Sequence, residues 1–289
     1  GEICERGYAF FSRAWKEMEF HCVKLEEVCR QKDAEFLGIL NDIKYGRNLQ
    51  NVIAYLESNQ SSDLMEEAPY LVGTNAKADK INQAHMRALD EKTEKKFWAI
   101  IEGDVTYEDI KNISFAKQSL VVNVGAKVML TANDANGEYV NGTMGTIIDI
   151  STERGDATCI QILTDKGKKV DVYRYEREIE RQDIEESKEK DKNGETVIVK
   201  KIVRKIVGSF KQFPIKIAWA MSIHKSQGQT FGQVNIDPRC WDSGQFYVAV
   251  SRAESVAGIH FMAPIMKQYI RTLSDEVIKI LRESLYSII

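Results

Sequence analysis

Residues 213–230 read FPIKIAWAMSIHKSQGQT, a short apolar strand from Ile215 to Ala218 followed by a polar loop from Ser222 to Gly228. Hydroxyl, imidazole, ammonium and amide groups crowd this loop. In α/β proteins, ligands bind where strands run into loops. Hydroxyls, amides and backbone N–H groups are the usual donors to phosphate oxygens, and Lys225 adds positive charge. The stretch therefore predicts a phosphate-binding loop, with an ordinary polar surface loop as the alternative.

The flanking sequence predicts more of an α/β domain. Helical spacing of apolar residues predicts helices at Ala9–Met18 and Ala34–Tyr45. For the second of these, Asp33 is the expected N-cap and Gly46 the expected stop. Cys22–Leu25 is expected to form a short strand between them. A strand that precedes a polar turn and a helix is the repeating unit of an α/β domain.

The same order recurs further along the chain. Ala68–Gly73 predicts a strand that runs into Thr74-Asn75 and then a helix. After Pro214, further buried strands are expected at Val234–Ile236 and Gly258–Phe261. Helices are expected at Gly244–Arg252 and Ile265–Leu285.

The middle of the chain has a different pattern. Short apolar runs separated by turn residues predict strands, which are Val121-Val122, Ala126–Leu130, Thr146–Ile150, Cys159–Leu163 and Lys169–Tyr173. This spacing is typical of a small antiparallel barrel. A charged hairpin is expected to follow, turning at Asn193-Gly194 and returning along Val197–Val207. We therefore expect an α/β domain interrupted by a β module at about 120–210.

Composition sets limits on function. The formal net charge is −3, so no global basic field indicates nucleic acid. No apolar run approaches the roughly 20 residues of a membrane-spanning helix. The 5 cysteines lack zinc-ligand spacing, which predicts reduced thiols in a cytoplasmic protein. A basic stretch, made of Lys200, Lys201, Arg204, Lys205 and Lys211, marks either a nucleic-acid contact or a solvated strand face.

A second segment, residues 244–252, reads GQFYVAVSR. Its apolar residues can pack in a core while Arg252 stands at the helix end. There the arginine either complements the helix dipole or binds a nucleotide phosphate, for which its planar guanidinium is well shaped.

Together these segments resemble a known family. Residues 213–230 resemble motif V and residues 244–252 motif VI of superfamily 1B helicases, and Leu25–Asp33, with its Arg-Gln pair, resembles motif IV. Gly125–Leu130 and Tyr139–Gly145 look like the entry to the family's inserted SH3-like barrel. The match is best to Pif-type and RecD/TraA-type helicases and covers essentially the whole chain.

The resemblance implies an α/β fold: a RecA-like (P-loop NTPase-type) second motor domain with an inserted small SH3-like β-barrel. Its first part is expected at 1–118, the barrel with the charged hairpin at 119–211, and its second part at 212–289. The implied activity is that of an ATP-dependent DNA helicase that moves 5′ to 3′. The SH3-like insert is expected to help grip or split the strand at the duplex junction.

Residue roles carry over by motif position. ATP with Mg²⁺ is the implied cofactor, held between two RecA-like domains, with the Mg²⁺ ligands in the other, N-terminal domain. Arg30 and Arg252 are the expected arginine fingers, and Gln31, Gln227 and Gly228 the expected nucleotide contacts. This chain itself is expected to bind no metal.

Single-stranded DNA is the implied partner, together with the duplex junction and the N-terminal RecA-like domain of the same chain; no membrane partner is expected. Thr74, Asn75, Ser222, His224 and Lys225 are the expected DNA contacts. Contacts to phosphate and sugar suit an enzyme that moves over any sequence. Ser222 stands where the family often has Thr, which keeps the hydroxyl.

One part of the family pattern is absent from residues 1–289. We find no GxxxxGK[ST] loop, and no acidic Walker B segment precedes Arg30. The chain is therefore expected to be a piece that starts just before motif IV and to lack ATPase activity alone. The alternative is a non-catalytic DNA- or partner-binding module derived from a helicase. A nuclease is disfavoured because no carboxylate and lysine cluster stands out.

Overall fold

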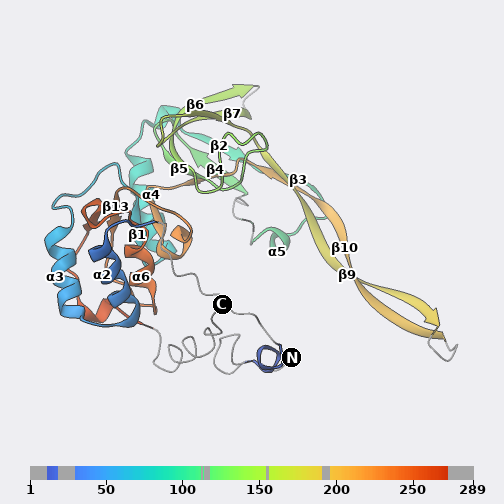
Figure 1. The fold of residues 1–289 in the computed structure, drawn as a ribbon. Helices are drawn as coiled ribbons and strands as arrows, with labels where there is room; N and C mark the ends of the chain where they lie inside the picture. The colour runs from blue at the N-terminus through green and yellow to red at the C-terminus, as the bar shows by residue number, and fades with distance from the viewer. Residues whose placement is uncertain are drawn as a thin grey trace. The chain divides into compact units, whose positions relative to one another are not determined.

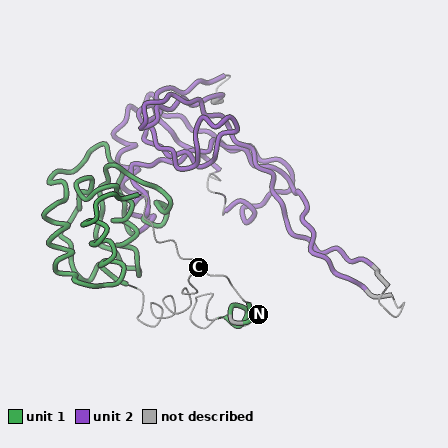
Figure 2. The backbone as a smooth tube through the Cα atoms, in the orientation of Figure 1, with its two compact units in different colours: residues 1–73, 223–289 green, residues 74–222 purple. Residues whose placement is uncertain are grey.

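The computed structural model describes residues 12–18, 30–111, 113, 118–153, 156–190 and 196–272. The chain divides into two compact units (Figure 2). Unit 1 comprises residues 1–73 and 223–289, and unit 2 comprises residues 74–222. Unit 1 therefore combines residues from both ends of the chain, as expected for an α/β domain that is interrupted by an insertion. The predicted strand at Cys22–Leu25 lies outside the described residues.

The described residues of the first part of unit 1 form the α-helices α1, α2 and α3 (Figure 1). α1 covers Arg13–Glu17, inside the predicted range, and α2 covers Ala34–Tyr45 as predicted. Asp33 caps α2 by accepting bonds from the next backbone N–H groups, and Gly46 ends it with a φ of 67°. α3, at Leu49–Asn59, was not predicted.

The sheet of unit 1 is parallel. β1 (Tyr70–Val72) pairs with β13 (Val234–Ile236), which pairs with β14 (Ile259–Phe261). All three residues of β1 and of β13 are buried, as expected for strands covered on both faces. Phe36 from α2 and Leu56 from α3 are fully buried in the same unit. The predicted strands are confirmed.

α6 covers Gln245–Val250, within the predicted helix. Its Phe246 ring stacks on Phe261 at 6.1 Å between centroids, which fixes α6 against the sheet. Three 3₁₀ turns complete this part of unit 1: η3 (Ile223–Ser226), η4 (Val256–Gly258) and η5 (Lys267–Tyr269).

The prediction of an α-helix from Ile265 is wrong for the described residues 265–272. Only the short η5 turn forms there. Ile265 and Ile270 are both buried at a spacing of five residues, which does not repeat on one face of an α-helix. The rest of the predicted helix lies outside the described residues.

The core of unit 2 is an antiparallel β structure. In the described residues one sheet has the order β11-β5-β6-β7-β8, and β2 pairs with β4. The bounds are β2 Lys95–Trp98, β4 Ser119–Val122, β5 Lys127–Leu130, β6 Met144–Glu153, β7 Asp156–Thr164, β8 Lys169–Val172 and β11 Ile215–Ile217. Phe97 and Leu120 of the smaller sheet share one buried core with Ile147 and Ile160 of the larger sheet. Phe213, which precedes β11, belongs to the same core. The predicted strands of this region are confirmed.

One α-helix of unit 2 packs against β12 (Ala220–Ser222). This helix is α4 (Asn75–Arg87), which is followed by η2 (Glu91–Thr93). The side chain of Asn82, which is 9% exposed, accepts from the backbone N–H of Ala220 and donates to its carbonyl, both at 2.8 Å. His85 stacks on Trp219 at 5.2 Å between ring centroids. The amide of Asn82 thus pairs with both backbone polar groups of Ala220 in β12.

A long two-stranded arm extends from unit 2 (Figure 1). It consists of β9 (Tyr175–Lys190) and β10 (Thr196–Gln212), with β3 (Ile100–Gly103) beside β10 at its root. This is the predicted charged hairpin; the predicted turn at Asn193-Gly194 lies outside the described residues.

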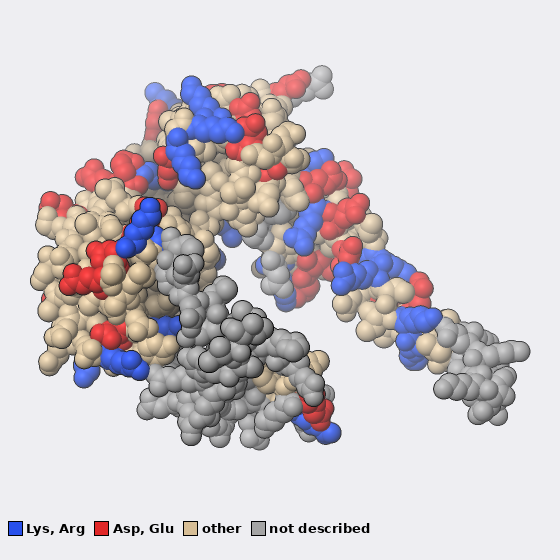
Figure 3. All heavy atoms as spheres, in the orientation of Figure 1, with Lys and Arg blue, Asp and Glu red and all other residues tan. Residues whose placement is uncertain are grey.

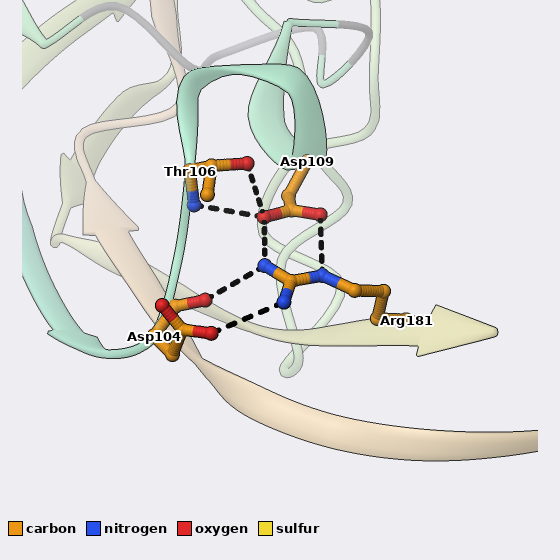
Figure 4. Close-up of polar contacts among 4 residues, drawn as sticks. All are labelled: Asp104, Thr106, Asp109 and Arg181. Atoms are coloured by element: carbon orange, nitrogen blue, oxygen red, sulfur yellow. Dashed lines mark hydrogen bonds and ion pairs between the residues drawn. The ribbon is translucent and has the colours of Figure 1, made fainter. Parts of the chain in front are cut away.

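The root of the arm has its own small core and a network of polar contacts. Ile179 and Phe210 pack with Ile110 of α5 (Tyr107–Ile110). Arg181 donates to Asp109 at 2.8 Å and to the side chain of Asp104 at 3.1 Å (Figure 4). Thr106 also donates its hydroxyl to Asp109 at 2.6 Å. The bonds from Arg181 first, and from Thr106 next, lower the pKa of Asp109 well below its usual range.

The basic stretch of β10 lies against acidic residues of β9, so that both signs alternate along the arm (Figure 3). Lys200 pairs with Glu186 at 2.9 Å, and Lys205 with Asp183 at 2.9 Å. These exposed pairs favour the solvated strand face over a dedicated anion site.

Candidate functional site

Arg30 lies just before α2 and reaches two segments from the other end of the chain. Its Nε donates to the Thr230 hydroxyl at 2.8 Å, and its Nη1 donates to the Ser251 carbonyl at 3.0 Å. A guanidinium carries five N–H donors. The remaining donors of Arg30 have no partner among the described residues and stay available to a ligand.

Arg252 follows α6 and is held over its last turn. Its Nε donates to the Val248 carbonyl at 3.0 Å, its Nη2 to the Ser251 hydroxyl at 2.9 Å, and its Nη1 to the Gln229 carbonyl at 3.4 Å. Bonds to helix-end carbonyls fit the dipole interpretation. They also fix the direction of the guanidinium, which is half-buried.

The two arginines meet at Ser251, although more than two hundred residues separate them in sequence. Burial first, and the charge of Arg30 second, lower the pKa of Arg252. Within the described part of the chain, no carboxylate forms an ion pair with either guanidinium. Two neighbouring cations without an anionic partner repel each other, and an anionic ligand would relieve that repulsion.

Gln31 has a positioning role in this arrangement. Its side chain is 3% exposed. Its Nε2 donates to the carbonyls of Ser251 at 3.0 Å and Ala253 at 2.8 Å. The amide therefore fastens the segment before α2 to the residues on both sides of Arg252, and its N–H groups are already used.

The loop from Ser226 to Thr230 lies beside the two arginines. Gln227 and Gly228 are exposed, and Gly228 has a φ of 85°, which favours glycine. The backbone N–H of Phe231 donates to the Arg252 carbonyl at 2.9 Å, which ties the end of the loop to the arginine. Among the described residues, no direct contact joins Gln227 or Gly228 to a guanidinium.

Two of the predicted DNA contacts lie in η3 of unit 1. His224 and Lys225 are both exposed. His224 Nε2 lies 3.8 Å from the Asp242 carboxylate, whereas Lys225 has no ion-pair partner in the part of the chain described. The Lys225 ammonium is thus available to a phosphate.

The other predicted DNA contacts belong to unit 2. Thr74 caps α4, with its hydroxyl accepting from the Lys77 backbone at 3.3 Å, and Asn75 is the first residue of that helix. Both are exposed. Ser222, at the end of β12, is only 4% exposed and offers little surface to a ligand.

Trp241 of unit 1 was not predicted as a site residue. Its side chain is 56% exposed. Its backbone N–H donates to Gln245 at 3.1 Å, and its carbonyl accepts from Arg271 at 2.8 Å. Gln245 also donates to the carbonyl of Gly73, directly after β1. An exposed indole on a backbone that is fixed beside a strand end is suited to stacking; the sequence signal was an aromatic residue shortly before the GQFYVAVSR segment.

The described residues contain no cluster of His, Cys, Asp and Glu that is suited to holding a metal ion. No helix in the described ranges is long and apolar enough to cross a membrane. Cys159 and Cys240 are free thiols, and burial raises the pKa of Cys240 to about 12.

No protein-family profile matches the chain. The ATP-dependent DNA helicase Pif1 of Bdellovibrio bacteriovorus is 30% identical over 261 residues, which cover 89% of this chain and 54% of that protein. The chain spans about half the length of the bacterial relatives it matches.

Solved structures agree in fold. The crystal structure of Bacteroides sp Pif1 in complex with ADP-AlF4 gives a TM-score of 0.72 at 26% identity, and covers 95% of this chain and 60% of that one. Bacteroides Pif1 bound to ssDNA gives a TM-score of 0.65 at 27% identity, and covers 95% of this chain and 59% of that one. The mixed α/β fold therefore matches that of Pif1 helicases.

Proposed function

Because the chain belongs with the Pif-type DNA helicases of superfamily 1B, we propose that it is part of an ATP-dependent DNA helicase. In this proposal the chain supplies two arginine fingers, Arg30 and Arg252, to an ATP molecule held by a P-loop domain. Residues 1–289 lack that loop, so this chain alone hydrolyses no ATP above background.

The observation that carries the proposal is the pair of adjacent guanidinium groups without a carboxylate partner in the described structure. Among the described residues Arg30 has N–H donors without a partner, and Gln31 fixes the backbone on both sides of Arg252. ATP supplies a transferable phosphoryl group whose charge spreads over its oxygens in the transition state. The two guanidiniums neutralise that charge, and fingers of this kind raise the rate by about 10³–10⁵. Gln227 and Gly228, on the adjoining loop, contact the same phosphate, and Mg²⁺ is bound by the P-loop domain.

The same relationship supports a finer description of the fold. Unit 1 is the RecA-like second motor domain, and the antiparallel core of unit 2 is the SH3-like insert. The boundaries expected from the sequence, 1–118, 119–211 and 212–289, remain our proposal for the domain organisation. The parallel sheet of unit 1 supports the RecA-like part of this proposal, whereas the buried core of unit 2 also includes Phe97 and Phe213, which lie outside 119–211. A cytoplasmic location belongs to the same proposal.

Single-stranded DNA is the proposed partner of the exposed residues at the strand ends. His224 and Lys225 are the proposed contacts to its backbone in unit 1, and Thr74 and Asn75 are the proposed contacts in unit 2. Trp241 stacks on a base, an interaction worth about 1–3 kcal/mol that suits any sequence. The Bacteroides relative bound to ssDNA supports this partner. Movement 5′ to 3′ and engagement of a duplex junction follow from the family.

The test is the DNA-stimulated ATPase of a protein that joins residues 1–289 to a P-loop domain. Arg252→Ala and Arg30→Ala each lower kcat by at least about 10³ while KM for ATP changes little, because the fingers act in the transition state. Arg47→Ala, at an exposed arginine after α2, is the matched control and keeps full activity. Full activity in Arg252→Ala would refute the finger assignment. Turnover by residues 1–289 alone, abolished by Arg252→Ala, would refute the need for a second domain.

A further inference from the structure

One face of the arm carries four exposed isoleucines among charged and polar residues. Residues that alternate along a strand, and residues paired across two strands, share a face. We define the isoleucine face by this register. Its members are Glu176, Glu178, Glu180, Gln182, Ile184, Glu186 and Lys188 on β9, and Ile198, Lys200, Ile202, Arg204, Ile206, Ser209 and Lys211 on β10. Its isoleucines at 184, 198, 202 and 206 are 61%, 60%, 72% and 60% exposed.

The opposite face of the arm is covered at its root. There Ile179 and Phe210 pack on α5, and Arg181 binds Asp109. In the described residues nothing covers the isoleucine face. Full burial of one isoleucine side chain stabilises a protein by roughly 1.5–3 kcal/mol, and a bare two-stranded hairpin is only marginally stable. Four large apolar side chains exposed on one face of a hairpin, two of them paired directly across the strands, mark a candidate interaction surface.

The charges on this face identify the partner. On the β9 side the charged residues from 176 to 186 are the glutamates Glu176, Glu178, Glu180 and Glu186, whereas Lys188, which pairs in register with Ile198, is basic. On the β10 side every charged residue from 198 to 211 is basic: Lys200, Arg204 and Lys211. A fitting partner needs a basic edge over β9, an acidic edge over β10, and apolar residues between them.

We propose that a second copy of this chain occupies the isoleucine face, related by a two-fold axis parallel to the arm. This rotation lays β9 of one copy over β10 of the other without a shift along the strands. Ile202 and Ile184 are paired in register, as are Lys200 and Glu186. Ile202 of one copy therefore faces Ile184 of the second copy, and Lys200 faces the second copy's Glu186.

The other two-fold arrangement is disfavoured. An axis across the arm lays β9 over β9, and it brings glutamates against glutamates and basic residues against basic residues. The axis along the arm alone satisfies both the apolar centre and the charged edges. A ribbon two strands wide buries less than the roughly 800 Å² per partner of a standard interface. The dimer is therefore weak and depends on concentration.

Sedimentation velocity over a concentration series extending into the hundreds of micromolar tests this proposal. The chain shows a monomer–dimer equilibrium, and Ile202→Thr, which keeps a β-branched residue, weakens it about tenfold. Val203→Thr, one position along on the opposite face, leaves it unchanged. Circular dichroism verifies that each variant keeps the strands. A chain that stays monomeric throughout, or a dimer that ignores Ile202→Thr, would overturn the proposal.

Charge reversal tests the contact between copies separately from contacts within one chain. Glu186→Lys alone and Lys200→Glu alone each weaken the homodimer, because like charges then face each other. Mixing the two variants restores association, although the Lys200–Glu186 pair within each chain remains broken. Failure of the mixture to associate better than either variant alone would contradict the proposed interface.

Cross-linking distinguishes the two arrangements. Packed sheets lie about 10 Å apart, too far for a disulfide, so a short bismaleimide reagent is used. Ile184→Cys mixed with Ile202→Cys gives cross-linked dimers in higher yield than either variant alone, and the unsubstituted chain controls for native cysteines. A higher yield from Ile184→Cys alone would indicate the axis across the arm and refute the one along it.

Discussion

Gln31→Ala is the change with the best-defined cost in this structure. The side chain is 3% exposed and donates to two buried carbonyls, those of Ser251 and Ala253. The Ser251 carbonyl keeps a second donor in Arg30, so it loses about 1 kcal/mol. The Ala253 carbonyl is left without a donor, which costs about 1–3 kcal/mol, and the lost methylene costs about 0.8 kcal/mol. Together these losses lower the free energy of unfolding by about 3–5 kcal/mol.

Urea denaturation followed by circular dichroism measures this loss. Gln31→Met keeps the packing volume and removes the donors, so it should lose about 2 kcal/mol. Gln50→Ala, at an exposed position of α3, should stay within about 0.5 kcal/mol of the unsubstituted chain. A Gln31→Met chain as stable as the unsubstituted one would refute the positioning role of this amide.

Three further outcomes follow from the contacts described. Asn82→Ala leaves the backbone N–H and carbonyl of the buried Ala220 without the bonds from this amide, so the free energy of unfolding measured in urea should fall by about 2–5 kcal/mol. A fall of less than about 1 kcal/mol would contradict this role of Asn82. Folding lowers the pKa of Asp109, so its bond to Arg181 stabilises the chain at pH values above the usual carboxyl pKa of about 3.9. The Asp109→Asn chain should therefore be less stable than the unsubstituted chain at neutral pH, and this difference in stability should shrink below about pH 4. A difference that stays constant with pH would argue against the role of this bond. An oligonucleotide should quench the tryptophan fluorescence of the chain, and Trp241→Phe should remove most of this quenching while weakening binding only modestly. Unchanged quenching in the variant would exclude stacking on Trp241. Absence of any binding by the unsubstituted chain would count against the DNA partner.

Local signals predicted much of the fold. α2 was predicted to the residue because Asp33, the apolar spacing and Gly46 all lie within or next to the helix itself. The strands of unit 2 were predicted because turn residues separate them. α3 was missed although its buried Val52 and Leu56 lie four residues apart, a spacing that indicates a helix face.

Features that depend on distant partners were not predictable locally. β3 is exposed at every residue and is a strand only because β10 lies beside it. The Asn82 amide gives no sign in sequence that it binds the backbone of Ala220. Ile265 and Ile270 resembled helix residues, but they are buried on either side of the short η5 turn rather than along one helix face.

The candidate site divides in the same way. The proximity of Arg30 and Arg252 was expected from the family resemblance alone, because nothing local links residues so far apart. Trp241 was missed because a single aromatic residue in a loop carries no periodic signal. The anchoring of Gln31 on Ser251 and Ala253 required coordinates, since a glutamine donates equally well to a ligand or to a backbone carbonyl.

The most direct test of the arginine fingers compares two nucleotide states in a protein that joins this chain to a P-loop domain. Affinity is measured for fluorescent ADP alone and for the same nucleotide with aluminium fluoride, which imitates the transferring phosphoryl group. Arg252→Ala should leave the affinity for ADP within about threefold and weaken that for the aluminium fluoride complex by at least about 10³, because the guanidinium acts on the charge of the transition state. Equal affinity of the variant and the unsubstituted protein for the aluminium fluoride complex would contradict the account.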